Sequence, residues 1–379
     1  MKKSIVINAL FSLLLVMLLA VAGCGDKGAG TSTPAQQVPE LNLGYIFTNH
    51  HTPLVVAATK GEEFKNQGVY LKSVVEKERY DLMDGDKKLA TLNFVVTKSG
   101  SETTTLFAQN NLDLGLASVT AIMSGNDKGT PIKTICPLQT DGMALVVPKD
   151  SSISNWESFL AYIKAAAQPV KIGYHSPTSA PRIVFEGALH EAGITITQDA
   201  NDATAKVLMV DLKDTANLNP ALTSKQVDGW VGPSPHPEVS VVQGVGKIAL
   251  DLRDLPPQGY WHDFPCCVVA ARDEVIAKNP EVIQKFVELM TKSSDWCNKN
   301  KEDAGTITAN WMGVPVDAAK ASLLVYSTKP TENWLRGTGI YMDVLNNMDK
   351  FSDKLKGKKF DDVKSLMFDF SFTEKANNK

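Results

Sequence analysis

From Leu41 onward, segments in which apolar and polar residues alternate are followed by segments whose apolar residues recur at helical spacing. Leu41, Leu43 and Tyr45 alternate with polar residues as the residues of a half-buried strand do, and Leu54–Phe64 then has the pattern of a helix. Strands that alternate with helices usually form a parallel-rich sheet covered by helices. The sequence therefore predicts an α/β fold, and it contains no internal repeat.

The same pattern continues for most of the chain. Further strands are expected at 69–75, 91–97, 112–117, 132–138, 143–147, 170–174, 207–210, 229–231, 247–252 and 266–271. Ser99–Glu102 and Ser154–Glu157 have the spacing of a capping box, in which an N-cap hydroxyl precedes a carboxylate by three residues, and each predicts a helix start. The turn residues within Glu76–Ala90 predict a hairpin insertion. After Ala271 the pattern is helical.

The chain is too long for one hydrophobic core. Its 379 residues exceed the roughly 250–300 residues at which a single core stops growing, so two lobes are expected. Extended segments near Val146–Lys149 and Phe264–Val268 predict two crossings between the lobes. The first lobe would then comprise residues 41–148 and 265–379, and the second residues 149–264.

The N-terminus has the features of a secretory signal peptide. Lys2 and Lys3 precede an apolar run, Ile5–Ala22, which ends in small residues directly before Cys24. The cysteine in this position resembles the lipobox of bacterial lipoproteins, in which the signal is cut before the cysteine and the cysteine carries the lipid. A plain signal peptide and a single membrane anchor are the alternatives, although the run is short for a span of roughly 20 residues.

The prediction is therefore a lipoprotein signal peptide at residues 1–23, lipidation of Cys24 and a flexible tether at residues 24–40. The tether is expected because Gly25–Pro39 is rich in Gly, Ser, Thr, Pro and Gln and nearly free of large apolar residues. Such a protein would lie in the cell envelope, either on the outer face of the cytoplasmic membrane or in the periplasm.

Charge and motifs exclude several functions. Removing Lys2 and Lys3 from the 39 basic residues leaves 37 against 42 acidic ones, a net charge of −5. A nucleic-acid partner is not expected, because such proteins need a basic face. The sequence has no GxSxG nucleophile elbow, P-loop, HExxH or GxGxxG motif, so neither an enzyme nor a cofactor is expected.

Four cysteines remain beside Cys24, namely Cys136, Cys266, Cys267 and Cys297. An oxidising envelope would permit disulfides among them, but spacing does not fix their pairing. We expect buried free thiols. Cys266 and Cys267 begin a strand-like run, so they should point to opposite faces and should not bond to each other. No CxxC zinc spacing is present.

Four landmarks carry a family resemblance. They are Gly44-Tyr45 followed by Gly61–Gly68; Leu112–Ser118; Val170–Gly173 leading to Ser176, Ser179 and Glu191–Ile194; and Val227–Trp230. In this order they resemble the nitrate/sulfonate/taurine-binding family of ABC-transporter solute-binding lipoproteins, over about residues 41–330. Three features depart from the family: Val231-Gly232-Pro233 stands where an acidic residue is common, and the hairpin insertion and the helical tail are unusual.

The resemblance implies a two-lobed periplasmic-binding-protein fold of type II-like architecture, with the ligand in the cleft between the lobes. The partners it implies are a small-molecule ligand and an ABC permease subunit that recognises the closed form of a monomer. Helix N-termini at such a cleft favour an anion, and Ser99–Thr103 and Ser176–Arg182 are two candidates. Alternatively, these hydroxyls only cap helices and Arg182 lies on the surface.

Residues expected at the cleft follow strands or begin helices. The predicted ligand-binding residues are Tyr45, His50, His51, Ser99, Ser101, Thr103, Ser118, His175, Ser176, Ser179, Arg182, Trp230 and His236. His190, in the middle of a helix, is expected to be structural. The leading ligand is a small sulfonate, nitrate or carboxylate anion.

Three other functions stay open at this point. A thiamine-pyrimidine precursor could stack on Tyr45 or Trp230. A metal or metal chelate could bind four loop histidines, whose imidazoles are common metal ligands: His50, His51, His175 and His236. An envelope enzyme of the related pyrimidine-synthase fold is the least favoured.

Overall fold

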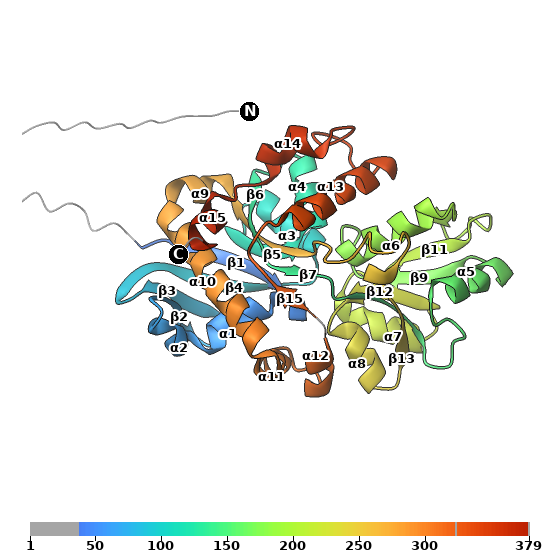
Figure 1. The fold of residues 1–379 in the computed structure, drawn as a ribbon, viewed down its shortest axis with the longest axis horizontal. Helices are drawn as coiled ribbons and strands as arrows, with labels where there is room; N and C mark the ends of the chain where they lie inside the picture. Colours follow the sequence, from blue (N-terminus) through green and yellow to red (C-terminus); the bar gives the residue numbers. More distant parts are fainter. Residues whose placement is uncertain (1–37, 323, 378–379) are drawn as a thin grey trace, which may run out of the picture. The chain divides into compact units, whose positions relative to one another are not determined.

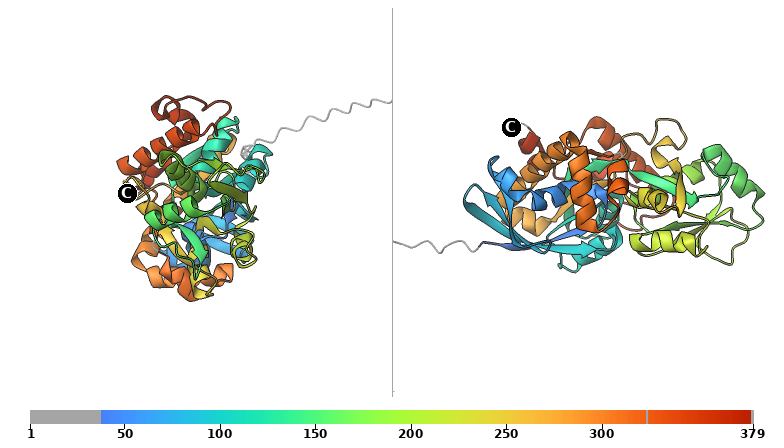
Figure 2. Two further views of the ribbon diagram at one scale, coloured as in Figure 1. Left: turned by 90° about the vertical axis from the view of Figure 1, so that its right-hand side faces the viewer. Right: turned by 90° about the horizontal axis from the view of Figure 1, so that it is seen from below.

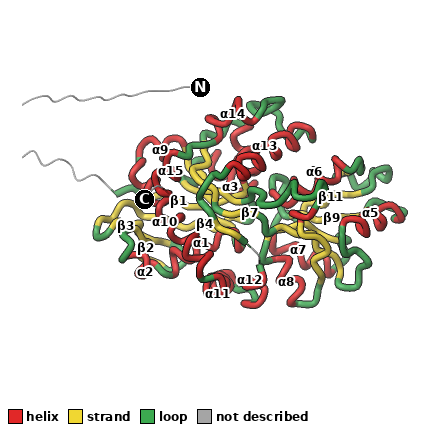
Figure 3. Tube along the Cα trace, in the orientation of Figure 1, coloured by secondary structure: helices red, strands yellow, loops and turns green. Residues whose placement is uncertain are grey.

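The computed structural model describes residues 38–322 and 324–377. The predicted signal peptide, Cys24 and nearly all of the predicted tether lie outside the described residues. Within the described ranges, no helix combines the length and the apolar character that a membrane span requires. The described chain forms two large sheets and a two-stranded one, with helices packed around them (Figures 1 and 3).

The first sheet has seven strands in the order β2-β3-β4-β1-β5-β14-β6. Its central strand β1 pairs in parallel with β4 and β5. Strand β3 is antiparallel to its neighbours β2 and β4, and β14 is antiparallel to its neighbours β5 and β6. The strand bounds are β1 Glu40–Ile46, β2 Val69–Val75, β3 Arg79–Asp84, β4 Lys87–Thr97, β5 Leu114–Ser118, β6 Ile132–Pro137 and β14 Cys267–Arg272.

The second sheet has six strands in the order β10-β11-β9-β12-β8-β13. Strands β10, β11, β9 and β12 are parallel, and β8 is antiparallel to both of its neighbours. The bounds are β8 Met143–Pro148, β9 Val170–Tyr174, β10 Ile196–Thr197, β11 Val207–Asp211, β12 Gly229–Pro233 and β13 Gly246–Asp251. A separate pair joins β7 (Gln139–Thr140) to β15 (Val325–Tyr326).

The helices before β14 alternate with strands, and most helices after it form the C-terminal tail (Figure 2). Their bounds are α1 Thr52–Thr59, α2 Gly61–Lys65, α3 Gly100–Ala108, α4 Val119–Asp127, α5 Trp156–Ala165, α6 Ala180–Glu191, α7 Leu218–Thr223, α8 His236–Val242, α9 Asp273–Lys278, α10 Pro280–Lys299, α11 Lys301–Met312, α12 Val316–Ala321, α13 Glu332–Asn347, α14 Phe360–Met367 and α15 Ser371–Asn377, with short 3-10 helices η1 Asn49–His51, η2 Thr215–Asn217 and η3 Leu252–Asp254.

The two large sheets confirm the predicted two-lobed α/β fold. We name the lobes after them, the seven-stranded lobe and the six-stranded lobe. Strand β8 belongs to the six-stranded sheet, so the first crossing lies between β7 and β8 and not at Val146–Lys149 as predicted. The apolar run 143–148 therefore continues as a sheet strand beyond the crossing. The return lies between the end of β13 at Asp251 and the start of β14 at Cys267, and the predicted segment Phe264–Val268 overlaps the end of this stretch.

Some local predictions were shifted or wrong. The predicted helix Leu54–Phe64 is divided into α1 and α2, and a Cβ at Gly61 would lie 1.9 Å from the carbonyl oxygen of Leu71. Only glycine allows this close approach of α2 to β2. The second capping box uses Asn155 and Ser158 instead of Ser154 and Glu157.

The predicted hairpin is present. It is formed by β3 and β4 and turns at Gly85, whose φ is +57°, so the turn is shorter than the sequence indicated.

One contact between the helical tail and the seven-stranded lobe is a buried carboxylate at the end of α4. Asp127 accepts hydrogen bonds from the backbone N–H groups of Ser352, Asp353 and Leu355, at 2.9–3.1 Å. Helix α13 also contacts α6, and α14 contacts α4. The tail therefore packs against both lobes, close to the helices that begin at the cleft described next.

Candidate functional site

A narrow cleft lies between the two lobes, with a free volume of about 30 Å³. Its lining residues come mostly from strand ends and helix starts: Ile46, Thr48, His50, Gly100, Ser118, Cys266 and Cys267 from the seven-stranded lobe, and His175, Ser179, Ala180, Pro181 and Pro233 from the six-stranded lobe. In α/β sheets ligands bind beyond the carboxyl ends of the strands, because the loops there converge. The cleft has the position expected of a ligand site in this fold.

Three helices begin at the cleft. Ser99 caps α3 by accepting a hydrogen bond from the N–H of Glu102 at 3.3 Å, and Ser118 caps α4 by accepting one from Ala121 at 3.3 Å. Ser179 stands at the N-cap of α6 without a side-chain capping bond. The first N–H groups of a helix lack intrahelical partners and carry partial positive charge. The three helix starts together make the cleft favourable for an anion.

Hydroxyl groups join the two lobes beside the cleft. The Oγ of Ser101 lies 2.9 Å from both the Oγ of Ser176 and the Oγ1 of Thr178. Ser118 and Thr120 donate to the backbone oxygen of Thr178, at 3.2 Å and 2.7 Å. The two lobes are therefore in direct contact at this edge.

His175 is a cleft residue with an unsatisfied nitrogen. It is buried, and within the described residues its Nδ1 has no hydrogen-bond partner. Burial, reinforced by the neighbouring His236 and His50, lowers the pKa of His175 to about 3. The ring is therefore neutral, with one nitrogen as donor and the other as acceptor. Because buried polar atoms normally have partners, a ligand is a suitable partner for this ring.

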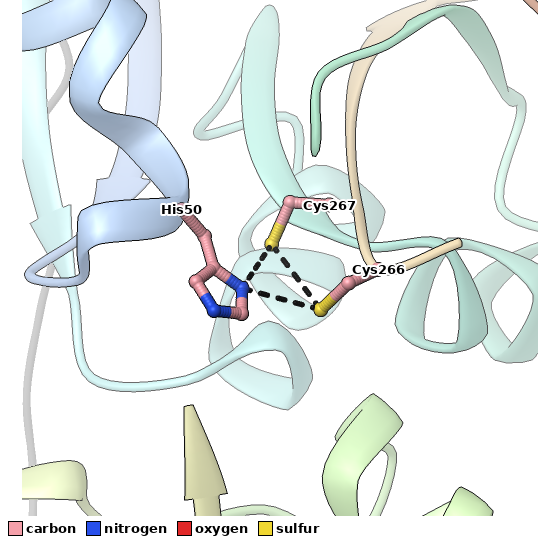
Figure 4. A group of neighbouring side chains, drawn as sticks. All are labelled: His50, Cys266 and Cys267. Atoms are coloured by element: carbon pink, nitrogen blue, oxygen red, sulfur yellow. Dashed lines mark hydrogen bonds between the residues drawn. The ribbon is translucent and has the colours of Figure 1, made fainter. Parts of the chain in front are cut away.

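His50 lies on η1, opposite two cysteines at the start of β14 (Figure 4). Its Nδ1 is 3.2 Å from the Sγ of Cys266 and 3.7 Å from the Sγ of Cys267, and the two sulfurs are 3.9 Å apart. Its Nε2 is 2.9 Å from the backbone oxygen of Gly142. These three side chains form the cluster of potential metal ligands found in the described part of the chain.

All four cysteines of the described residues are buried and unbonded, as predicted. The expectation that Cys266 and Cys267 face opposite ways is wrong, because both sulfurs approach His50. Cys266 precedes the first residue of β14, so the two cysteines are not consecutive residues of a regular strand.

The two predicted aromatic cleft residues lie elsewhere. Trp230 is fully buried and packs in an apolar cluster of the six-stranded lobe, so the prediction that it lines the cleft is wrong. Tyr45 is buried too, and its hydroxyl accepts a hydrogen bond from the Nε1 of Trp311 at 3.1 Å. Burial raises the pKa of Tyr45 to about 12. Both side chains point into the core of their lobes.

His51 and Arg182 are occupied by internal partners. The Nδ1 of His51 accepts a hydrogen bond from the N–H of Ile46 at 3.0 Å, and burial lowers the pKa of His51 to about 3. The Nε of Arg182 lies 2.6 Å from Glu186, and both side chains are buried. The prediction that these two residues contact a ligand is therefore not supported by their positions.

The remaining predicted residues differ in position. His50, Ser118, His175 and Ser179 line the cleft, and Ser101 and Ser176 join the lobes at its edge. Ser99 caps α3, and Thr103 bonds to the backbone oxygen of Ser99, so these two hydroxyls serve the helix. His236 lines a different hollow, with Phe47 and Thr215.

The four loop histidines do not gather around one point in the described residues, so the alternative of a four-histidine metal site is not supported. Sequence reasoning also missed several cleft residues. Thr48 and Gly100 lie next to predicted residues, and the Cys266-Cys267 pair at the return crossing was interpreted only as buried thiols.

Comparison with solved structures finds the same fold in several solute-binding proteins. Similar structures include a ligand-binding component of an ABC-type import system from Staphylococcus aureus with zinc bound (TM-score 0.69, 15% identity, 90% of this chain and 100% of that chain). Another is the alkanesulfonate-binding protein SsuA from Xanthomonas axonopodis pv. citri bound to MOPS (TM-score 0.63, 13% identity, 85% of this chain and 97% of that chain). A third is the periplasmic nitrate-binding protein NrtA from Synechocystis PCC 6803 (TM-score 0.62, 14% identity, 90% of this chain and 89% of that chain).

At these low sequence identities the similarity shows a shared fold and no more. The family is shown by a separate comparison of the sequence. The sequence model of the NMT1-like family matches residues 34–313, which is most of the chain. This chain belongs to the NMT1-like family.

Proposed function

We propose that this protein is the solute-binding component of an ABC importer and that it holds a small anion in the cleft between its lobes. The observation that carries the proposal is the meeting of three helix N-termini, those of α3, α4 and α6, at a cleft lined from both lobes. Likeness to solute-binding transport components supports binding rather than catalysis.

The cleft itself limits the ligand. In the described part of the chain no Lys, Arg, Asp or Glu lines the cleft, so an anionic head group would be held by backbone N–H groups, hydroxyls and imidazole. The free space between the closed lobes is only about 30 Å³, well below the ~300–1,000 Å³ typical of ligand pockets, so little more than a small head group would fit there and the lobes would have to move apart to admit it. Both features favour a sulfonate, nitrate or small carboxylate, and similar structures include alkanesulfonate- and nitrate-binding proteins.

A thiamine-pyrimidine precursor is less well supported. Its case depended on stacking against Tyr45 or Trp230, and both rings are buried outside the cleft. The cleft lining contains no Phe, Tyr or Trp among the described residues, so a planar ring would lack an aromatic surface to stack on.

His175→Ala should weaken anion binding about tenfold, because one hydrogen bond contributes roughly 1–1.5 kcal/mol. Isothermal titration calorimetry of methanesulfonate, taurine, nitrate and acetate would measure this and rank the anions. His190→Ala is the matched control, since His190 is exposed near the end of the same helix, α6, and should leave affinity unchanged. Binding of none of these anions, or equal affinity in both variants, would argue against the cleft as an anion site.

We also propose that the protein is attached to the membrane through lipid on Cys24. The support is the apolar run that ends in Val21-Ala22-Gly23-Cys24. In cells, Cys24→Ser should either release the protein from the membrane fraction or leave the uncleaved precursor, as detected by immunoblotting of fractions. Normal cleavage together with membrane retention in that variant would contradict lipid attachment.

A further inference from the structure

We propose that Cys266, Cys267 and His50 bind one thiophilic d10 metal ion, Zn²⁺ or Cu⁺, at the wall of the cleft. The ligand atoms would be the two sulfurs and the imidazole Nδ1 (Figure 4). Thiolate and imidazole are the ligands these ions prefer, whereas Mg²⁺ and Ca²⁺ require oxygen ligands, and among the described residues no carboxylate lines this cleft.

The spacing of the three atoms fits one ion. With Zn–S near 2.3 Å and Zn–N near 2.0–2.1 Å, tetrahedral angles place two sulfurs about 3.8 Å apart and a sulfur and a nitrogen about 3.6 Å apart. The structure has 3.9 Å between the sulfurs and 3.2 Å and 3.7 Å from Nδ1 to each sulfur. Small side-chain rotations would therefore bring all three atoms to coordination distance.

The outer contact of His50 selects the nitrogen that faces the sulfurs. Its Nε2 lies 2.9 Å from the backbone oxygen of Gly142, which can only accept a hydrogen bond. Nε2 therefore carries the proton in the neutral ring, and the lone pair of Nδ1 points toward Cys266 and Cys267. Histidines that bind metals usually donate their other N–H to a carbonyl or carboxylate in this way.

The two cysteines are held in place by their backbones. The oxygen of Cys266 accepts a hydrogen bond from Val119 at 2.7 Å. Cys267 donates its N–H to the Oε1 of Gln139 at 3.1 Å and accepts from Leu138 at 3.0 Å. A metal site needs such preorganised ligands, because little ordering then remains to oppose binding.

Charge and access also suit a metal. Two thiolates and a neutral imidazole balance the charge of Zn²⁺, so the buried site would be neutral, which reduces the cost of placing charge away from water. All three residues line the cleft, so an ion can enter through it. A three-ligand zinc site leaves its fourth position open. If the anion-binding function proposed above holds, an anionic solute could occupy that position.

The test is metal titration of the purified protein, kept reduced and first made metal-free. Zn²⁺ and Cu⁺ would each be titrated against a coloured competing chelator. We expect one ion per chain. Co²⁺ in place of Zn²⁺ should give thiolate-to-metal bands in the near ultraviolet and the visible bands of tetrahedral Co²⁺. The dissociation constants of Zn²⁺ and Cu⁺, each measured against its chelator, would identify which of the two ions the site prefers.

Variants separate this site from other thiols. Cys266→Ser and Cys267→Ser should each lower the affinity on the order of a hundredfold and weaken the thiolate bands, since each removes one of three ligands. Cys136→Ala and Cys297→Ala remove buried thiols outside the cluster and should leave the affinity unchanged. Circular dichroism would verify that each variant is folded.

The proposal is overturned if neither ion binds, if the cluster variants bind as tightly as the parent, or if Co²⁺ shows no thiolate bands. A disulfide between Cys266 and Cys267 in the isolated protein, detected by mass spectrometry, would also overturn it. Anion titrations of metal-free and metal-loaded protein separate the two proposals. Failure of anions to bind either form counts against the anion-binding function and leaves the metal site standing.

Discussion

Glu186→Gln is expected to lower the free energy of unfolding by about 3–5 kcal/mol, the usual cost of removing one partner of a buried ion pair. The Oε1 of Glu186 lies 2.6 Å from the Nε of Arg182, and the two side chains are only 1% and 2% exposed. The guanidinium also lies 4.1 Å from the ring centre of Tyr174. The substitution would leave that guanidinium charged, buried and without its carboxylate. Urea unfolding followed by circular dichroism would measure the loss.

A matched control uses an ion pair on the surface. Glu281 pairs with Lys87, and both side chains are about 60% exposed. Glu281→Gln should change stability by less than about 1 kcal/mol, because exposed pairs contribute little. A loss of equally small size for Glu186→Gln would show that Arg182 is solvated. The sequence-based prediction that Arg182 contacts the ligand would then regain support.

Trp230→Ala should also destabilise the protein by about 3–5 kcal/mol, the typical cost of deleting a large buried aromatic side chain. The indole is fully buried against Val146, Leu212, Leu218 and other apolar residues of the six-stranded lobe. Its removal would leave a cavity in that core. Thermal and urea unfolding would measure the effect, with Trp230→Phe as a control that keeps most of the volume and should cost less.

Ligand affinity distinguishes the core role of Trp230 from a cleft role. Under conditions where Trp230→Ala stays folded, its affinity for the anion should be reduced less than that of His175→Ala. A stable Trp230→Ala protein that had lost anion binding would show that the indole contacts the solute.

The architecture could be predicted from sequence because strand and helix periods differ and are local. The alternation from Leu41 onward predicted the α/β class, which the two large sheets confirm. The division of α1 from α2 could not be predicted, since it depends on the contact of Gly61 with the backbone of Leu71. That contact joins residues ten positions apart, and no periodicity encodes it.

The candidate site was predicted in part. His50 and His175, which were expected at the cleft because they follow strands, line it in the structure, and their contact with a ligand stays a prediction. The same rule failed for His51 and Tyr45, whose rings turn inward to the N–H of Ile46 and to Trp311. Which way a side chain turns at a strand end is decided by distant partners.

The internal ion pair of Arg182 is indicated by the local sequence. Glu186 is four residues later in the same helix, a spacing that commonly forms an ion pair. By contrast, nothing local places His50 beside Cys266 and Cys267, because more than two hundred residues separate them. Only the folded chain brings that imidazole and those thiols together.

The most direct test of the central claim is a crystal structure of the protein with the tightest-binding anion from the titrations. We expect the anion in the cleft between the lobes, within hydrogen-bond distance of the His175 ring and of backbone N–H groups at the starts of α3 or α6. A well-ordered anion bound only outside this cleft would contradict the claim.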